Sequence, residues 1–330
     1  MKAAFVTNGK QIINEVFKPE TQTRLKDMFD FYDGVYDYTE SDKLSDVECI
    51  FSSWGCPPYT EEEIKKFFPK LKVVFYGAGT VQYFARPFLN LGIKVISAWQ
   101  ANSIPVMEYT VAQIILANKG YFQVARMIES PDGYKMVSKY FGTFPGTYGC
   151  RVGLIGLGAI GAGVAERLKD YNLEVCAYDP FASQEKAERL GVKLVGLEEL
   201  FETSQTISNH VANLPETVGI LNKSLFDRMK DNATFINTGR GAQVVEEDLI
   251  EALKEKPKRT AVLDVTYPEP PVEGSELYEL PNVILTPHMA GSYGEERYRL
   301  GDYVTEEAER YLAGQELRYS VTLKMLETMA

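Results

Sequence analysis

Residues 152 to 161 read VGLIGLGAIG, an apolar run that passes into three glycines with GxGxxG spacing. The apolar run predicts a buried strand. Apolar residues then recur at every fourth position, at Ile160, Val164 and Leu168, which predicts one face of a helix. A strand, a glycine turn and the start of a helix in this order form the pyrophosphate site of a dinucleotide-binding fold, because the helix N-terminus faces the anion.

Each glycine of this motif has a separate expected role. Gly156 makes the tight turn, Gly158 lets the backbone approach the phosphates, and Gly161 lets the helix pack close to the strand. A second predicted strand ends at Asp179, close to the ~20 residues expected between the last glycine and the carboxylate that binds the adenosine ribose. Asp179 should repel a 2′-phosphate, so NAD is favoured over NADP. The alternative interpretation is a glycine turn in another kind of α/β domain.

The acidic composition limits the partners that we expect. The chain has 35 Lys and Arg against 46 Asp and Glu, a formal net charge of −11, so neither nucleic acid nor an anionic membrane is expected to bind. No apolar run approaches the ~18 residues of a membrane span, and the first residues are too short for a signal peptide. The four cysteines lack metal-ligand spacing, so we expect no metal site, and buried free thiols in a reducing cytoplasm.

Two α/β domains are predicted, because apolar strands alternate with helices in both parts of the chain and such alternation implies parallel sheets covered by helices. The predicted strands are 3–6, 48–51, 71–75 and 94–96 in the first part, and 152–155, 174–178, 206–209, 233–237, 260–264 and 283–286 in the second. The last six complete a Rossmann fold. We expect this NAD-binding domain, 104–291, to be inserted in a flavodoxin-like substrate domain formed by 1–103 plus 292–330.

Several helices have recognisable ends. Thr60 and Glu63 form a capping box at the start of one helix. A longer helix is expected over 103–119, with Pro105 in its first turn, where a missing N–H does no harm. A further helix is expected over 294–312.

The segment 120–150 does not fit the alternation of strands and helices. It is rich in aromatic residues, which are Tyr121, Phe122, Tyr134, Tyr140, Phe141, Phe144 and Tyr148. So many aromatic side chains outside regular elements predict a surface that becomes buried. Burial against a partner subunit, as a dimerisation arm, is one interpretation. Packing against its own domain is the other.

Polar residues collect where the strands of the second part end, at the edge of a parallel sheet that binds ligands. The only two histidines, His210 and His288, both follow such strands, and histidine titrates near ~6.5, which suits proton transfer. Glu269 would hold the ring of His288 and keep it protonated. Arg240, between two glycines, can bind a carboxylate through two parallel hydrogen bonds. Taken singly, each of these residues is equally compatible with an ordinary loop position.

Four sequence blocks together resemble the D-isomer-specific 2-hydroxyacid dehydrogenase family. They are VGLIGLGAIG at 152–161, INTGRG at 236–241, LDV at 263–265 through Glu269-Pro270, and TPHMAGS at 286–292. The resemblance implies that Arg240 binds the substrate carboxylate, that Glu269 pairs with His288, and that His288 is the acid and base at the substrate oxygen. It also implies an NAD-dependent oxidoreductase that interconverts a 2-oxo acid and a D-2-hydroxy acid, usually as a homodimer.

The resemblance implies two further sets of contacts. The expected NAD contacts are Gly156, Gly158, Ala159, Ile160, Gly161, Asp179, His210, Thr217, Thr238, Gly239, Asp264 and Ala290, with Asp264 at the nicotinamide amide. The expected substrate contacts are Trp54 and the backbone N–H groups of Gly77, Ala78 and Gly79. Trp54, Tyr76 and Tyr83 suggest an aromatic-lined pocket, or they are simply core aromatics.

The chain departs from the family pattern at several positions. Ala212 and Leu214 stand where proline and threonine are usual, and Gly239 stands where alanine is frequent. After Gly79 the usual aspartates are absent. The resemblance also leaves an NAD-binding regulatory protein, similar to transcriptional corepressors, as an alternative, although the retained Arg240, Glu269 and His288 weigh against it. Related formate dehydrogenases usually carry glutamine in place of the glutamate.

Overall fold

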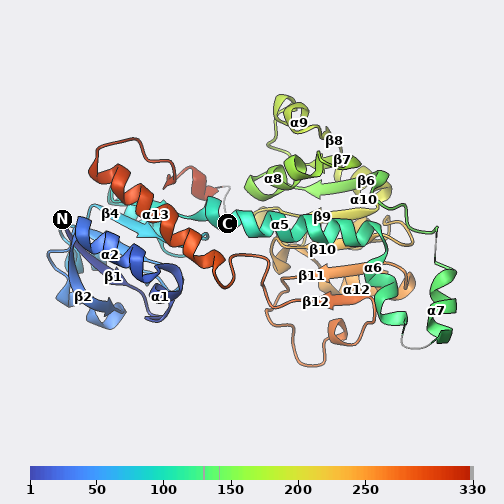
Figure 1. Ribbon diagram of the computed structural model, residues 1–330, viewed down its shortest axis with the longest axis horizontal. Helices are drawn as coiled ribbons and strands as arrows, with labels where there is room; N and C mark the ends of the chain where they lie inside the picture. The colour runs from blue at the N-terminus through green and yellow to red at the C-terminus, as the bar shows by residue number, and fades with distance from the viewer. Residues whose placement is uncertain (129–130, 141, 328–330) are drawn as a thin grey trace. The chain divides into compact units, whose positions relative to one another are not determined.

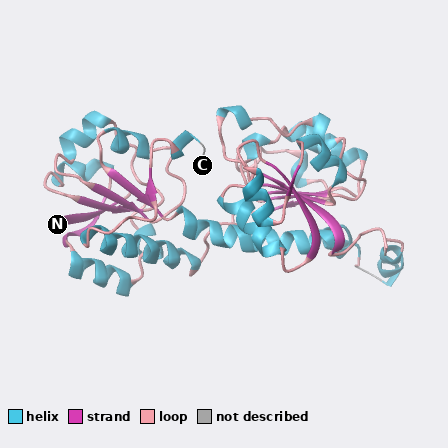
Figure 2. Ribbon diagram, turned by 90° about the horizontal axis from the view of Figure 1, so that it is seen from above, coloured by secondary structure: helices cyan, strands magenta, loops and turns pink. Residues whose placement is uncertain are grey.

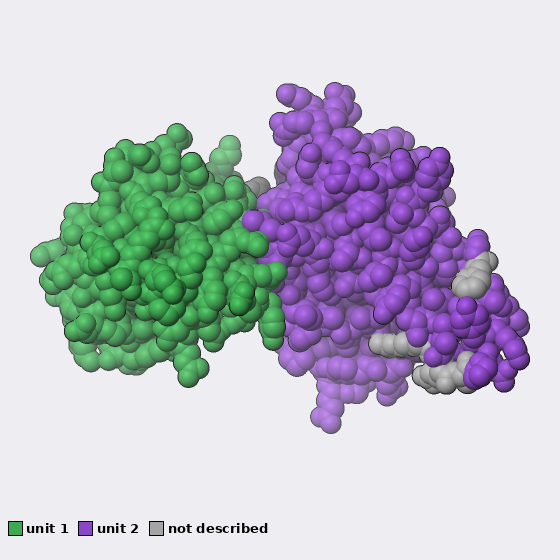
Figure 3. Space-filling view, viewed as in Figure 1, with its two compact units in different colours: residues 1–103, 292–330 green, residues 104–291 purple. Residues whose placement is uncertain are grey.

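The computed structural model describes residues 1–128, 131–140 and 142–327. Phe141, residues 129 and 130 of the expected arm, and the last three residues lie outside the described part. The chain divides into two compact units, unit 1 formed by Met1–Ser103 and Ser292–Ala330, and unit 2 formed by Ile104–Gly291 (Figure 3). Each unit is an α/β structure with helices on both faces of its sheet, the fold class that the sequence predicted (Figure 2).

Unit 1 contains a six-stranded sheet with the order β13-β5-β4-β3-β1-β2. All neighbouring strands are parallel except β13, which is antiparallel to β5. The order of β2, β1, β3, β4 and β5 is that of flavodoxin-like folds. The strands are β1 (Lys2–Val6), β2 (Asp30–Tyr36), β3 (Cys49–Ser52), β4 (Val73–Tyr76), β5 (Lys94–Ser97) and β13 (Ser320–Val321). The helices are α1 (Ile12–Val16), α2 (Pro19–Met28), α3 (Glu61–Phe67), α4 (Ala85–Asn90) and α13 (Glu296–Leu312), with 3-10 turns η1 (Tyr38–Lys43) and η6 (Met325–Glu327).

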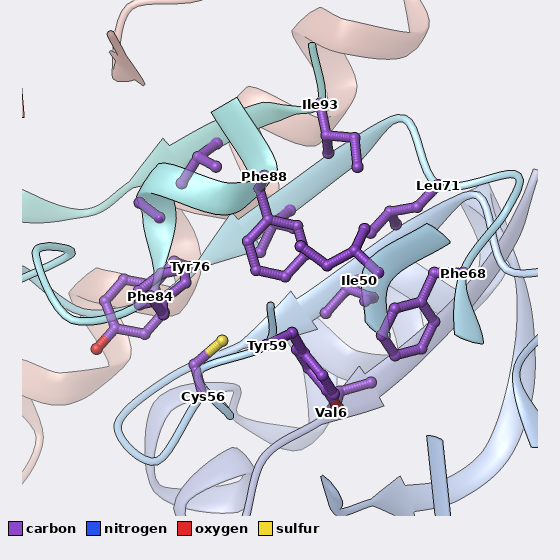
Figure 4. Packing of buried hydrophobic residues seen from close by; sticks show 14 of the residues in the cluster. Val6, Ile50, Cys56, Tyr59, Phe68, Leu71, Tyr76, Phe84, Phe88 and Ile93 are labelled. Carbon is purple, nitrogen blue, oxygen red and sulfur yellow. The ribbon is translucent and has the colours of Figure 1, made fainter. Parts of the chain in front are cut away.

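The central strands of unit 1, β3 and β4, are buried on both faces, and each face of the sheet has its own hydrophobic core. Along β3, Ile50 belongs to one core, and Cys49 and Phe51 belong to the other, as the two-residue period of a strand requires. Figure 4 shows the first core, in which the ring of Tyr59 packs edge-on against Phe68 with centroids 5.1 Å apart. Two strands, β2 and β13, were not predicted. The exposed and half-buried residues of β2, and the two-residue length of β13, give no continuous apolar run.

Unit 2 contains a seven-stranded parallel sheet with the order β12-β11-β10-β9-β6-β7-β8. The strands are β6 (Tyr148–Ile155), β7 (Asn172–Tyr178), β8 (Lys193–Leu194), β9 (Thr206–Asn209), β10 (Thr234–Asn237), β11 (Thr260–Leu263) and β12 (Val283–Leu285). All six predicted strands are present. The expected total of six strands was wrong, because the sheet also contains β8. This strand has only two residues, too few for a hydrophobic pattern in the sequence.

The helices of unit 2 cover this sheet, except α7, which lies apart from it (Figure 1). They are α5 (Trp99–Asn118), α6 (Tyr121–Val124), α7 (Pro131–Ser138), α8 (Ala159–Leu168), α9 (Gln184–Leu190), α10 (Leu197–Thr203), α11 (Lys223–Phe226) and α12 (Glu246–Glu255), with 3-10 turns η2 (Ala125–Met127), η3 (Pro215–Thr217), η4 (Gly241–Gln243) and η5 (Glu276–Tyr278). Among the described helices, none has both the length and the apolar composition needed to cross a membrane.

The helix ends confirm one prediction and correct another. Thr60 and Glu63 form the predicted capping box, with Glu63 N donating to Thr60 Oγ1 at 3.2 Å and Thr60 N donating to Glu63 Oε2 at 2.8 Å. The prediction for Pro105 was wrong. α5 begins at Trp99, so Pro105 lies inside the helix, where it removes one backbone hydrogen bond.

The aromatic segment 120–150 divides into two groups. Phe122 packs against a core of unit 2, and the ring of Phe144 lies next to Gly120. Tyr121, Tyr134 and Tyr148 are exposed, and α7 lies at the periphery, apart from the sheet (Figure 1). Packing against its own domain therefore describes part of this segment, and burial of its exposed side chains against a partner subunit, as a dimerisation arm, stays a prediction.

Candidate active site

The glycine turn after β6 has the geometry that its three glycines predicted. Gly156 has φ +89°, and a Cβ at this position would lie 3.0 Å from the carbonyl oxygen of His210. A Cβ at Gly161 would lie 1.9 Å from the carbonyl oxygen of Gly156, so this glycine permits the close packing of α8 on the turn. A Cβ at Gly158 would meet no atom within 4 Å, which leaves open space at the start of α8. No side chain caps this helix at Gly158, and Ala159 and Ile160 begin its first turn.

Asp179 is tied directly to this glycine turn. Its Oδ2 accepts a hydrogen bond from the backbone N–H of Leu157 at 2.7 Å, and its Oδ1 accepts from Phe181 N at 2.8 Å. Lys186, which sequence reasoning missed, donates from Nζ to the carbonyl oxygen of Leu157 at 2.6 Å. The carboxylate therefore lies beside the turn, at the end of β7, as the spacing predicted.

His210 also lies at a strand end, but the proton-carrying role suggested for both histidines does not fit it. Its side chain is buried beside the glycine turn, and burial lowers its pKa to about 3, so the ring is neutral at neutral pH. Nδ1 lies 3.3 Å from Oγ1 of Thr238, which is itself 3.4 Å from Oγ1 of Thr110. The Nε2 atom has no hydrogen-bond partner among the described residues.

Thr217 and Gly239, two other predicted cofactor contacts, have local roles. The hydroxyl of Thr217 donates to the carbonyl oxygens of Ala212 and Leu214, at 2.8 and 2.9 Å, and accepts from Leu214 N at 2.9 Å. It thus closes the loop in which the sequence departs from the family pattern. Gly239 lies in the loop after β10, and its carbonyl oxygen accepts a hydrogen bond from Nη1 of Arg240 at 2.8 Å.

Arg240, Glu269 and His288 come together in unit 2. Nδ1 of His288 lies 2.7 Å from Oε1 of Glu269, and both side chains are about half exposed. Burial lowers the pKa of the Arg240 guanidinium, and the negative charge of Glu269 opposes this shift. The three side chains that the sequence selected therefore belong to one electrostatic cluster.

Asp264 holds the loop that carries His288. It is almost fully buried, and its Oδ1 accepts from Thr286 Oγ1 at 2.6 Å and from Met289 N at 2.9 Å, while Oδ2 accepts from Ala290 N at 2.9 Å. His288 itself has φ +52°, a left-handed conformation that costs a non-glycine residue on the order of 1–2 kcal/mol. These hydrogen bonds on both sides of His288 stabilise its conformation. The expected contact of Asp264 with the cofactor stays a prediction.

In unit 1, the loops after β3 and β4 carry the predicted substrate contacts. The N–H of Gly77 donates to Ser52 O at 2.8 Å, so the expected donation from Gly77 to a substrate is contradicted by its use in the sheet. Ser97 Oγ donates to the carbonyl oxygens of Ala78 and Gly79 at 2.8 and 2.9 Å, which fixes the backbone of this loop.

The aromatic residues suggested for the pocket differ in their surroundings. Tyr76 is buried and packs against Phe84 with ring centroids 4.7 Å apart, so it is a core residue. Tyr83 is 48% exposed. Trp54 is partly buried, and the guanidinium of Arg297 lies 5.7 Å from the centroid of its ring.

The residues of unit 2 fit a bound dinucleotide. The open space at Gly158 and the uncapped start of α8 leave room and N–H donors for a pyrophosphate, and the backbone of His210 lies beside the same turn. Among the described residues, no cluster of three or more histidine, cysteine, aspartate or glutamate side chains has the arrangement of a metal site.

Comparison with known proteins finds relatives both by sequence and by structure. Residues 112–290 match the family model of the "D-isomer specific 2-hydroxyacid dehydrogenase, NAD binding domain". The D-3-phosphoglycerate dehydrogenase of Archaeoglobus fulgidus is 36% identical over 236 residues, which cover 72% of this chain and 44% of the relative. That of Methanocaldococcus jannaschii is 33% identical over 276 residues, which cover 83% and 51%. The chain thus spans about half the length of these curated relatives.

Solved structures show the same fold along the whole chain. D-mandelate dehydrogenase of Rhodotorula graminis superposes with a TM-score of 0.80 and 21% identity over 97% of each chain. D-2-hydroxyisocaproate dehydrogenase superposes with a TM-score of 0.76 and 20% identity over 98% of this chain and 100% of the other. The family match covers more than half of the sequence. The chain therefore belongs to the D-isomer specific 2-hydroxyacid dehydrogenase family, and the cofactor of its second unit is NAD.

Proposed function

We propose that this protein is an NAD-dependent oxidoreductase that interconverts a small 2-oxo acid and the corresponding D-2-hydroxy acid. The observation that carries the proposal is the pairing of His288 with Glu269 next to Arg240, on the unit that binds NAD. A regulatory protein without turnover would need none of these three groups, so the retained cluster favours the enzyme.

The proposed division of roles follows from the chemistry of the side chains. When bound, NAD supplies or accepts the hydride. Arg240 binds the substrate carboxylate through its planar guanidinium, which presents two parallel N–H donors. Glu269 accepts a hydrogen bond from Nδ1 of His288 and stabilises the protonated ring, which leaves Nε2 to donate a proton to the carbonyl oxygen during reduction. In the reverse direction, Nε2 takes the proton from the hydroxyl group.

We propose that substrate contacts also come from Trp54 and from the N–H groups of Ala78 and Gly79. The Ser97 hydroxyl group, which fixes the carbonyl oxygens of Ala78 and Gly79, supports a rigid backbone donor site. The exposed Tyr83 and the half-buried Trp54 favour an apolar or aromatic substrate side chain.

The remaining cofactor assignments are proposals of the same kind. We propose that the pyrophosphate binds at Gly156, Gly158, Ala159, Ile160 and Gly161, and that Asp179 binds the adenosine ribose. The other proposed contacts are His210, Thr217, Thr238, Gly239, Asp264 and Ala290. The hydrogen bond from Leu157 N to Asp179 supports the ribose site, because it places the carboxylate beside the turn.

We propose a homodimer in the cytoplasm, with 120–150 as the arm that contacts the partner subunit. The exposed side chains of Tyr121, Tyr134, Met136 and Tyr148, each at least half exposed, support this interface. Light scattering of the full chain tests it. A monomer at micromolar concentration would contradict the proposed arm.

The test of the activity is NADH oxidation with a panel of 2-oxo acids: glyoxylate, hydroxypyruvate, pyruvate, phenylpyruvate, 2-oxoisocaproate and 2-oxoglutarate. The proposal predicts turnover with at least one member, and the preferred member reports whether the pocket is small, branched or aromatic. NADH binding without turnover of any member would instead favour the regulatory protein.

A further inference from the structure

Three amide side chains form a buried network below the Arg240 loop. Asn209 ends β9, Asn237 ends β10, and Gln243 lies in η4, and all three are fully buried. Nδ2 of Asn209 donates to Oε1 of Gln243 at 2.6 Å and to Oδ1 of Asn237 at 3.0 Å. Nε2 of Gln243 donates to the carbonyl oxygens of Val211 and Ala212 at 2.7 and 3.0 Å. Buried amides are costly unless their polar atoms are paired, so this network specifies one arrangement of the loops.

The network holds the backbone of Arg240 at both of its polar groups. Oε1 of Gln243 accepts from Arg240 N at 3.2 Å, and Nδ2 of Asn237 donates to Arg240 O at 3.1 Å. Oδ1 of Asn237 also accepts from Gly239 N at 3.0 Å. The direction in which the Arg240 side chain leaves the loop is therefore fixed by the amides of Asn237 and Gln243.

Gly239 packs so closely against the same network that there is no room for a side chain at this position. A Cβ at this position would lie 2.9 Å from Nδ2 of Asn209 and 2.9 Å from Oε1 of Gln243, closer than real Cβ atoms approach other heavy atoms. An alanine at position 239 therefore requires at least one of these two side chains to move.

We propose that Asn209, Asn237 and Gln243 are positioning residues that orient Arg240 toward the substrate carboxylate, and that Gly239 makes room for their network. The inference rests on the proposed function of Arg240. It extends that function to three buried amides that hydrogen-bond the backbone of the Arg240 loop or one another.

The first test is Gln243→Leu, with Gln205→Leu as the matched control. Gln205 is a buried glutamine of the same unit whose Nε2 donates to Asn232 O at 2.7 Å, away from the Arg240 loop. We expect Gln243→Leu to raise KM for the preferred 2-oxo acid about tenfold or more, as for a lost buried hydrogen bond. The Kd for NADH should change less than about twofold, and Gln205→Leu should leave KM near the wild-type value. If Gln243→Leu does not fold, Gln243→Met keeps the side-chain length for the same comparison.

A second test needs no turnover and therefore remains informative if the proposed activity fails. We expect Gly239→Ala to lower the Tm of the wild-type protein, and to lower it much less in the background Asn209→Ala/Gln243→Leu, where the close atoms are absent. An equal decrease in both backgrounds would overturn the proposed coupling. A KM that rises no more for Gln243→Leu than for Gln205→Leu, or a parallel loss of NADH affinity, would overturn the positioning role.

Discussion

Asp264→Asn is predicted to destabilise the loop that presents His288. The carboxylate accepts from Thr286 Oγ1, Met289 N and Ala290 N inside a nearly solvent-free site. An asparagine has only one acceptor oxygen, so in either orientation of the amide its NH2 group faces at least one backbone N–H. One unsatisfied buried N–H and one lost hydrogen bond to a charged group together cost about 2–5 kcal/mol.

The left-handed conformation of His288 adds to the sensitivity of this loop. Its backbone strain of about 1–2 kcal/mol is offset by the hydrogen bonds that Asp264 accepts from residues before and after His288. We therefore expect Asp264→Asn to lower the free energy of unfolding by at least about 2 kcal/mol. We also expect kcat to decrease about 10- to 100-fold, because the imidazole is no longer held in place.

Urea unfolding and steady-state kinetics measure these two effects. Thr286→Val is the matched control, since it removes one of the three donors to the carboxylate, together with the contact of Thr286 Oγ1 with the Tyr109 hydroxyl, and leaves the two N–H groups paired with the carboxylate. Thr286→Val should lower the free energy of unfolding by about 1 kcal/mol. An Asp264→Asn protein with wild-type stability and a weaker affinity for NADH would refute the reasoning, because Asp264 would then act on the cofactor alone.

Three further predictions concern other parts of the site. Arg240→Lys should raise KM for the 2-oxo acid by about tenfold or more, because the ammonium group cannot form two parallel hydrogen bonds; unchanged affinity in steady-state kinetics would argue against the clamp. Gly161→Ala should abolish NADH binding measured by fluorescence, because its Cβ would lie 1.9 Å from the carbonyl oxygen of Gly156; wild-type affinity would contradict the close packing. The pKa of His210 falls from 6.5 to about 3 on folding, so the unfolded chain binds more protons between these values and stability decreases as pH falls below 6.5. This slope, at most about 1.4 kcal/mol per pH unit, should be absent in His210→Gln; identical slopes between pH ~6.5 and ~5 would contradict the buried neutral ring.

The sequence predicted the elements whose apolar pattern is continuous. The strand predicted over 260–264 differs by one residue from β11, Thr260–Leu263, whose residues are buried on both faces. β2 was missed because it is an exposed edge strand, and β8 because two residues carry no period. The early start of α5 was missed because Trp99 offers no side-chain cap signal of the kind that marked Thr60.

The candidate site was predicted where a motif fixes residue types and spacing. Arg240, Glu269 and His288 were found in this way, and the structure joins them. The same reasoning treated His210 and His288 alike, since both follow strands, and only their burial distinguishes them. The amides Asn209 and Gln243 were missed, because a buried amide network has no periodic signature and depends on contacts between loops distant in the sequence.

The most direct test of the central claim compares kcat of His288→Gln and the wild-type protein for the preferred 2-oxo acid, with the Kd for NADH measured in parallel. We expect kcat to fall by about 10²–10⁴, because the proton donor at the substrate oxygen is lost. The affinity for NADH should be retained, because the substitution leaves the cofactor site unchanged. Unchanged turnover in His288→Gln would contradict the assignment of His288 as the acid and base.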